Sequence, residues 1–406
     1  MNKKNTEAKP IEKRFAFKPR VSILDEQSQM NGHTDLRGFF SLFWWLLIGY
    51  VISTLVRNFN ETGSVLGQDL GYKMFYRFYL LLIGDILMCF STFIMFLLCK
   101  LVAMRILSLF IASILRYILH VAFLTSVVIF LNTFDFFWVQ TGSFLMHALC
   151  LMMKMHSFFE VNAKMHSDML SGKKEENVYP SNVTLYNYLE LLCFPVLIYE
   201  IECPRTDKIR PMYIVRKLSG ALFSMFLIYT TIEHYVTPIL NTKDITKFEA
   251  IIHLTLPYAV LYMLLFFTVF ECFCNVIAEL TMFADRNFYD DWWNSASFDD
   301  FARRWNKPVH LFLLKHVYFK SINTNFSKQS ATFITFLVSS IVHEFFMIVI
   351  GKKFKPYLFG FQMFQLPLIY FMRLNFFKEY PFIGNSIFWG GIFVGTPLIT
   401  VLFCLD

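Results

Sequence analysis

The sequence predicts an all-α protein that crosses a membrane several times. Hydrophobic residues make up 56% of the 406 residues and charged residues only 17%, and the mean hydropathy is +0.48. Apolar runs of about 20 residues recur along most of the chain, and each is long enough to cross a hydrocarbon layer of about 30 Å. The sequence lacks the alternation of apolar and polar residues that marks barrel strands. A polytopic helical membrane protein is therefore expected.

Nine membrane spans are predicted from the positions of these runs. A polar, basic tail (residues 1–38) precedes the first span. We expect this tail to be mostly disordered, and it lacks the hydrophobic region of a cleavable signal peptide. Residues 39–406 are expected to form a single membrane domain. The predicted spans, of which the fourth is the weakest, cover residues 39–56, 78–102, 106–131, 143–161, 212–236, 248–280, 331–350, 357–372 and 387–405.

Two segments between the spans are expected to lie at the membrane surface. Leu185–Arg210 is rich in aromatic residues and contains proline, which favours an amphipathic segment in the interface over a further crossing. Thr281–Ser330 is a polar loop between the sixth and seventh spans. It carries the densest motifs of the chain, so we expect it to contribute to a site.

The distribution of lysine and arginine predicts the orientation. Basic residues gather in the tail and in the loops 162–211 and 281–330, and short basic loops face the cytoplasm. Nine spans then place the N-terminus in the cytosol and the C-terminus in the lumen. The glycosylation sequon at Asn60, in the expected loop Arg57–Arg77, becomes lumenal. A short lumenal loop with three lysines (Lys352, Lys353 and Lys355) is the exception to this rule.

Charge and cysteine usage narrow the possible partners. The net charge of +7 is modest and lies in the loops, which indicates cytoplasmic loops rather than nucleic-acid binding. The eight cysteines do not follow a metal-binding spacing, and only Cys272 and Cys274 are close together. We therefore expect free buried thiols, with no metal site and no cofactor.

Ionisable residues inside predicted spans are costly unless they are paired or line a cavity, so each is a candidate for function. Asp85 lies in the second span, and Arg116 and His120 lie four residues apart in the third. The simplest interpretation is a structural ion pair between these neighbouring helices. Similar candidates in later spans are Glu271, Glu279 and Glu344, and we expect Glu344 to have a structural partner.

His343 lies inside the seventh span, in the sequence SSIVHEFFM (Ser339–Met347). Its helical face carries Ser339 and Ser340, whose small side chains leave room for a ligand or a close helix contact. A neutral imidazole in this apolar setting is suited to act as a general base. The sequence of this segment alone favours a core histidine that is hydrogen-bonded, within its helix or to a neighbouring one.

The loop before the seventh span contains FYDDWWN (Phe288–Asn294) and RRWNKPVH (Arg303–His310). Its aromatic residues suit anchoring at a membrane interface. Its acidic pair, Asp290 and Asp291, stands among arginines, which predicts a buried polar network of these two with Arg286, Arg303 and Arg304. Asn306 and His310 are four residues apart and share one face of a short helix.

This residue set is suited to acyl transfer at a membrane. An asparagine such as Asn306 can donate a hydrogen bond to a developing oxyanion, while His343 accepts a proton. The basic residues of the loop can contact the phosphates of a soluble donor.

FYDDWWN resembles the FYxDWWN signature of the sterol and diacylglycerol O-acyltransferase branch of the membrane-bound O-acyltransferase family. The matching positions are Phe288, Tyr289, Asp291, Trp292, Trp293 and Asn294. Three further segments agree in order: PRTDKIR (Pro204–Arg210), WNKPVH (Trp305–His310) and VHE (Val342–Glu344). The resemblance covers Leu185 to the C-terminus strongly and the first spans by hydropathy alone. The motifs are most similar to those of fungal sterol acyltransferases.

The resemblance implies a fold of nine membrane helices around a buried chamber in the endoplasmic reticulum. It implies Asn306 and His343 as the catalytic pair, acyl-CoA as a substrate from the cytosol and a sterol as a substrate from the bilayer. It also implies a homodimer or homotetramer, although the tail is short for such enzymes. We expect Trp305, His310, Arg303 and Arg304 to line the acyl-CoA path.

Two other functions remain open at this stage. Diacylglycerol could replace the sterol as acceptor, since both present one hydroxyl on an apolar body. A transporter that uses His343, Asp85 and Arg116 as a polar pathway belongs to a different class, and it would leave the motifs of 281–330 unexplained.

Overall fold

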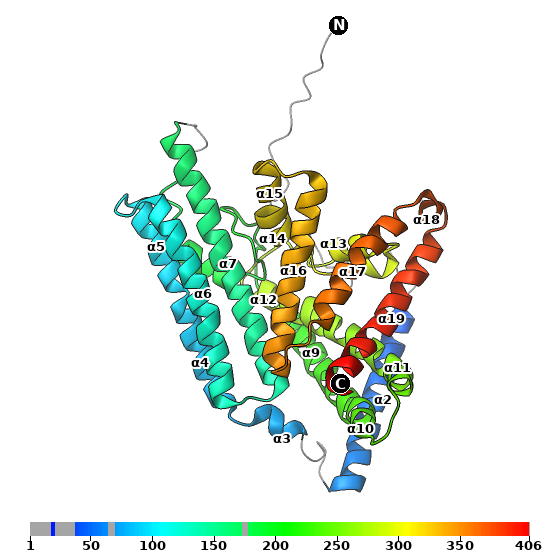
Figure 1. The fold of residues 1–406 in the computed structure, drawn as a ribbon. Helices are drawn as coiled ribbons and strands as arrows, with labels where there is room; N and C mark the ends of the chain where they lie inside the picture. Colours follow the sequence, from blue (N-terminus) through cyan, green and yellow to red (C-terminus); the bar gives the residue numbers. More distant parts are fainter. Residues whose placement is uncertain (1–17, 21–36, 64–69, 173–177, 406) are drawn as a thin grey trace.

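The computed structural model describes residues 18–20, 37–63, 70–172 and 178–405. In these residues the regular structure is helical, and backbone pairing of the β type is confined to two isolated bridges. The all-α class is therefore confirmed. Figure 1 shows the long helices standing roughly side by side. The predicted disorder of the tail falls on residues outside the described ranges, except for 18–20.

The first half of the chain contains these helices: α2 (Arg37–Thr62), α3 (Leu70–Phe75), α4 (Phe78–Ser91), α5 (Phe93–Ala103), α6 (Leu109–Phe134), α7 (Trp138–Leu170) and α8 (Leu185–Cys193). The middle contains α9 (Pro211–Thr231), α10 (Thr237–Asn241), α11 (Lys247–Phe266) and α12 (Cys274–Leu280), with π-helical turns η3 (Ile232–Val236) and η4 (Phe267–Phe273).

The remaining elements are η5 (Trp292–Asn294, a 3₁₀ turn), α13 (Phe298–Arg304), α14 (Lys307–Leu313), η6 (Leu314–Tyr318, a π turn), α15 (Phe319–Asn323), α16 (Lys328–Gly351), α17 (Tyr357–Met372), α18 (Asn375–Glu379) and α19 (Pro381–Leu405). The segment 281–330 was predicted as a loop, but much of it is helical.

Each predicted span falls on a helix. In the described part of the chain, six helical segments are long and apolar enough to cross a membrane, and they coincide with the second, third, fifth, sixth, seventh and ninth predicted spans. The first and fourth coincide with α2 and α7, and the eighth with α17. The protein is therefore a multi-pass membrane protein, and the number of nine crossings stays a prediction. Asn60 lies in the last turn of α2, not in the predicted loop.

The helices form two groups joined by α16 and α17. Helices α4, α5 and α6 pack against α7 on one side, and α9, α11 and α19 pack together on the other. Helix α16 contacts both α7 and α17 between them, as Figure 1 shows. Most buried apolar side chains of the described residues belong to one continuous core that runs from Leu81 in α4 to Phe388 in α19.

Helix α7 shows why the fourth span gave a weak signal. Its 33 residues include Lys154, which is 7% exposed. Lys154 Nζ donates to the carbonyl oxygens of Leu192 and Phe194, both at 2.7 Å, and so satisfies acceptors at the end of α8. With nine residues, α8 is about 14 Å long and too short to cross a membrane. The residues that follow it, 194 and 196–199, are buried in the protein.

Candidate active site

His343 lies in α16 with its side chain exposed, so a substrate can reach the imidazole. Its Nδ1 is 2.8 Å from the carbonyl oxygen of Ser339, one turn earlier. Because a carbonyl can only accept a hydrogen bond, the neutral ring carries its proton on Nδ1. The lone pair of Nε2 is therefore free to accept a proton from a ligand, as a general base must.

Asn306 caps the N-terminus of α14. Its Oδ1 accepts a hydrogen bond from the backbone amide of Val309 at 3.1 Å, the usual geometry of an asparagine cap. This contact occupies the acceptor end of the side-chain amide and fixes its orientation. The two N–H groups on Nδ2 are left to donate to another partner, such as the oxygen of a reacting carbonyl.

The two candidates lie on the two arms of a helical hairpin. The first arm runs through α14, η6 and α15, the turn covers residues 324–327, and α16 is the second arm. Helix α16 packs against η6 and α15, and Figure 1 shows the arms side by side. At 1.5 Å per residue, Asn306 and His343 each lie about 25 Å from the turn. By this helical estimate, the two residues lie at similar distances from the turn.

The FYDDWWN segment holds the chain on both sides of Asn306. The backbone amide of Asp290 donates to the carbonyl of Arg304 at 2.9 Å, and the amide of Lys307 donates to the carbonyl of Phe288 at 3.0 Å. Two ion pairs reinforce this contact: Asp291 with Arg304 at 2.8 Å and Asp290 with Lys307 at 2.7 Å. Lys307 was not among the predicted partners of Asp290 and Asp291, so these contacts on both sides of Asn306 were not predicted from the sequence.

The aromatic residues of the same segment are packing groups. Trp292 is fully buried, and Tyr289 is 1% exposed. The Tyr289 hydroxyl donates to Glu271 at 2.7 Å. We call the surrounding rings the aromatic cluster: Tyr262, Phe266, Phe270, Tyr289, Trp292, Trp293, Phe301, Trp305 and Trp389. Interface anchoring by Trp292 is therefore wrong, because its ring contacts protein on every side.

The residues expected along the acyl-CoA path differ in how many contacts hold their side chains and in how exposed they are. The Trp305 ring stacks on Tyr262 at a centroid distance of 4.5 Å. Arg304 contacts two carboxylates, whereas Arg303 pairs with Asp299 yet stays 51% exposed. Burial, with the charges of Arg303 and Lys307, lowers the pKa of His310 to about 4, so this ring is neutral at cytosolic pH. Asn294 is exposed and donates to Asp291 at 3.4 Å.

The predicted network of Asp290 and Asp291 with three arginines is partly wrong. Arg286 lies elsewhere, with Glu279, and Arg303 pairs with Asp299 and Asp300. Asp290 and Asp291 are also 39% and 48% exposed at their side chains. These ion pairs are partly exposed to solvent. They help to hold the backbone on both sides of Asn306 and do not form a buried charge cluster.

Three distant segments meet beneath the motif. Thr206 donates from its amide to the carbonyl of Met282 at 2.8 Å, and the amide of Ala284 donates to Pro204 at 3.0 Å. On the other side, Arg20 of the tail exchanges backbone hydrogen bonds with Ala284 and Arg286, at 3.1 and 3.0 Å. The PRTDKIR motif is thus a backbone partner of the segment that leads into FYDDWWN.

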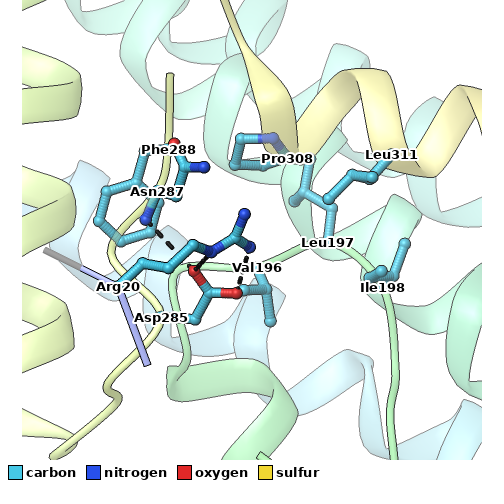
Figure 2. Close-up of a pocket in the computed structure, with 9 residues that line it drawn as sticks. All are labelled: Arg20, Val196, Leu197, Ile198, Asp285, Asn287, Phe288, Pro308 and Leu311. Atoms are coloured by element: carbon cyan, nitrogen blue, oxygen red, sulfur yellow. Dashed lines mark hydrogen bonds and ion pairs between the residues drawn. The ribbon is translucent and has the colours of Figure 1, made fainter. Parts of the chain in front are cut away.

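A pocket opens beside this meeting point. It encloses about 300 Å³, its open mouth included, and lies between the tail, residues 196–198 and the first turn of α14. Figure 2 shows the Arg20 guanidinium against the Asp285 carboxylate, with Pro308 and Leu311 on the α14 side. The two bonds between Arg20 and Asp285 measure 2.7 and 2.5 Å. No sequence signal indicated that the tail would reach this site.

Comparison with known proteins shows the family of this chain. Residues 75–405 match the membrane-bound O-acyltransferase family. Probable sterol O-acyltransferase 2 of Schizosaccharomyces pombe is 34% identical, over 95% of this chain and 90% of its own length. The chain belongs to the membrane-bound O-acyltransferase family. Probable sterol O-acyltransferase 1 of the same yeast is 29% identical over 96% and 86%. Diacylglycerol O-acyltransferase 1A of Glycine max is 32% identical but covers only 66% of this chain.

Charged residues within the helices of this family member find other partners than predicted. Asp85 binds His147 of α7, at 2.6 Å, and Arg116 pairs with Glu160 of α7. The predicted pairing of Asp85 with Arg116 is therefore wrong: α7 lies against both α4 and α6 and supplies both partners. The backbone carbonyl oxygen of Arg116 accepts a hydrogen bond from the His120 ring nitrogen Nδ1.

Glu344 has a structural partner, as expected, but a backbone one. Its Oε2 accepts from the amide of Phe359 at 2.8 Å, in the first turn of α17, where acceptors stabilise free amides. Glu279 binds Arg210 and Arg286, and Glu271 binds Lys217 at 2.5 Å. These ion pairs link Arg210, Lys217 and Arg286 to the buried carboxylates of η4 and α12.

Potential metal ligands come together once in the described part of the chain. The ligand atoms of Asp85, Cys89 and His147 lie within 4.8 Å of one another. The hydrogen bond between Asp85 and His147 already satisfies two of these groups, so the expectation of no metal stays a prediction. All eight cysteines are free, as expected, but only Cys99 and Cys272 are buried, and Cys193 and Cys404 are exposed.

Proposed function

We propose that this chain is a sterol O-acyltransferase of the endoplasmic reticulum membrane. It transfers a long-chain fatty acyl group from acyl-CoA to the 3β-hydroxyl of a sterol, and the product is a storage steryl ester. Two yeast relatives named as probable sterol O-acyltransferases align over nearly the whole chain, whereas the diacylglycerol enzyme aligns over two thirds of it. Sterol is therefore favoured over diacylglycerol as acceptor.

The geometry of His343 carries the proposed mechanism. With its proton on Nδ1 and held by Ser339, the ring presents Nε2 as the base. Nε2 removes the proton of the sterol hydroxyl as that oxygen attacks the thioester carbonyl. The tetrahedral intermediate collapses with loss of the CoA thiolate, which takes the proton from the imidazolium. No covalent acyl-enzyme forms, and no metal or cofactor is required.

Asn306 supplies the complementary charge stabilisation. Its Nδ2 donates to the carbonyl oxygen as negative charge develops there, while Oδ1 stays bound to the cap of α14. A positioned general base contributes about 10²–10⁴-fold to the rate, and one oxyanion donor about 10²–10³-fold. The pair accounts for the part of catalysis that depends on side chains of this chain.

The same proposal extends to topology and assembly. Acyl-CoA approaches from the cytosol, where Arg303 and Arg304 meet its phosphates and Trp305 and His310 line its path. The sterol enters from the bilayer. The N-terminus is cytosolic and the C-terminus lumenal, and the chains associate as homodimers or homotetramers.

The experiment is an assay of purified protein with labelled oleoyl-CoA, given ergosterol or diacylglycerol in parallel. We expect steryl ester as the main product of the wild type and at least 10²-fold less for His343→Ala. His253→Ala is the matched control, because that histidine lies 57% exposed on α11 with only Glu249 as its ion-pair partner. Turnover by His343→Ala near the wild-type rate contradicts the mechanism, and triacylglycerol as the main product contradicts the acceptor.

A further inference from the structure

The first arm of the hairpin, which begins at Asn306, is fastened to α7 and to residues 199–200 at one short stretch. Lys315 bonds to the carbonyl of Tyr199 at 3.3 Å and pairs with Glu200. His316 bonds to Ser157 at 2.8 Å, and Lys320 pairs with Glu160 at 2.7 Å. We call these residues the anchor cluster: Ser157, Glu160, Tyr199, Glu200, Lys315, His316 and Lys320.

The Ser157 hydroxyl has a defined direction within the cluster. Its oxygen accepts from the backbone amide of Tyr199 at 2.8 Å, so its own proton is available to the His316 ring. His316 Nε2 then accepts and must be unprotonated, which places the ring proton on Nδ1. Ser157 is fully buried and His316 is 8% exposed. Loss of either partner would leave a buried polar group unsatisfied.

The surroundings keep this histidine neutral. On α7, the His156 ring meets the His316 ring edge-on at 5.3 Å, and His120 of α6 lies next in line, 5.8 Å from His156. The charged groups that face the cluster are Arg116, Glu160, Lys315 and Lys320. Burial and the positive charge of Lys315 lower the pKa of His316 to about 3. The bond to Ser157 is therefore unchanged across physiological pH.

The cluster acts at the π-helical turn η6, which contains Lys315 and His316. A π turn interrupts the regular hydrogen-bond ladder of a helix and often occurs near functional sites. Asn306 lies ten residues upstream of His316, about 15 Å along the same helix. Helix α16 packs against both η6 and α7. A shift at η6 therefore moves Asn306 relative to His343.

We propose that Ser157 and His316 are positioning residues: their buried hydrogen bond sets the level of Asn306 opposite His343. This inference rests on the proposed function for its kinetic consequence, but the anchoring itself does not. A misplacement of about 1 Å in a catalytic donor can reduce the rate by about 10²-fold. Neither Ser157 nor His316 is among the residues proposed to contact the substrates, so we expect the larger effect in kcat and a smaller one in KM.

The variants distinguish loss of the hydrogen bond between Ser157 and His316 from a change in side-chain volume. Ser157→Ala removes the donor to His316, and His316→Leu removes the acceptor. His316→Gln places an amide oxygen near the position of Nε2 and retains an acceptor that does not titrate. Ser167→Ala is the control on α7, because that exposed hydroxyl bonds only to its own helix, at Ala163.

We expect Ser157→Ala and His316→Leu to lower kcat by about 10- to 100-fold, with KM for oleoyl-CoA and ergosterol within about threefold of the wild type. His316→Gln should recover most of the loss, and Ser167→Ala should match the wild type. Hydrogen–deuterium exchange provides a readout without catalysis: amides of 307–313 should exchange faster in Ser157→Ala than in Ser167→Ala.

The outcomes distinguish the two proposals. Wild-type kcat together with wild-type exchange in Ser157→Ala overturns the positioning role. A kcat loss in His316→Gln as large as in His316→Leu also overturns it, since the hydrogen bond would then be irrelevant. If the wild type forms no ester but Ser157→Ala still accelerates exchange at 307–313, the anchoring stands and the reaction assignment falls.

Discussion

Tyr289 of the FYDDWWN segment donates its hydroxyl hydrogen bond to Glu271 of η4 across 2.7 Å. Lys217 of α9 approaches the same carboxylate at 2.5 Å. The carboxylate is 1% exposed at its side chain, so its charge depends on these donors. This contact joins a motif outside the predicted spans to a buried carboxylate within the sixth predicted span, and it gives the Tyr289 hydroxyl a structural partner.

Tyr289→Phe should therefore destabilise the protein. The change removes one donor from a buried carboxylate while keeping the ring in the aromatic cluster, at a cost of about 1–3 kcal/mol. Thermal unfolding in detergent should show a lower midpoint than for the wild type. Tyr72→Phe is the control, because Tyr72 is 72% exposed. Equal midpoints for the two variants would show that the Glu271 contact does not stabilise the fold.

Asn306→Asp tests the donor role of the side-chain amide without disturbing the helix cap. Aspartate caps a helix as well as asparagine does, so the bond from the Val309 amide is retained. The Nδ2 donor is replaced by a negatively charged oxygen that repels an oxyanion. We expect kcat to fall by at least about 10²-fold with an unchanged melting temperature. An Asn306→Asp enzyme with turnover within threefold of wild type refutes the assignment.

The pH dependence of stability should reveal His316. Its pKa is lowered to about 3 by burial, with Lys315 as the second cause, against about 6.5 in an unfolded chain. Above pH 6.5 both states are neutral at this site. As the pH falls from about 6.5 toward 3, only the unfolded state binds the proton, so unfolding becomes more favourable.

The measurement compares melting temperatures of the wild type and His316→Gln between pH 7.5 and 5. The wild type should lose more stability on acidification than the variant, which cannot bind that proton. His310, whose pKa is also lowered, contributes equally to both proteins and cancels in the comparison. Identical slopes would show that His316 titrates normally in the folded protein.

The contact between Arg20 and Asp285 should couple the tail to the motif segment. Asp285 is 3% exposed at its side chain but Arg20 is 40% exposed, so solvent screening keeps the interaction modest. A double-mutant cycle with Arg20→Ala and Asp285→Ala should give a coupling free energy of about 1 kcal/mol. The pair of Lys352 with Asp135, at 48% and 80% exposure, is the control and should give a value near zero. A coupling free energy no larger than that of the control pair would contradict an attachment of the tail to the motif segment through Arg20 and Asp285.

The sequence alone determined the class of the fold and the positions of most helices. A membrane span must be about 20 apolar residues long because unpaired backbone groups are not tolerated in lipid, and this constraint can be read locally. The eighth span, predicted at 357–372, coincides with α17. The FYxDWWN resemblance also led to the correct family, and it singled out Asn306 and His343, whose catalytic roles stay predictions.

Only the tertiary structure decided which residues pair. Asp85 binds His147 and Arg116 binds Glu160 because α7 packs against both of their helices, and no spacing along the chain encodes that neighbour. The attachment of Arg20 to Asp285 spans more than 260 positions. Hydropathy indicates whether a segment can lie in lipid, whereas a hydrogen bond between segments depends on their arrangement in space. The contact of His316 in η6 with Ser157 of α7 likewise joins segments that neither motif specifies.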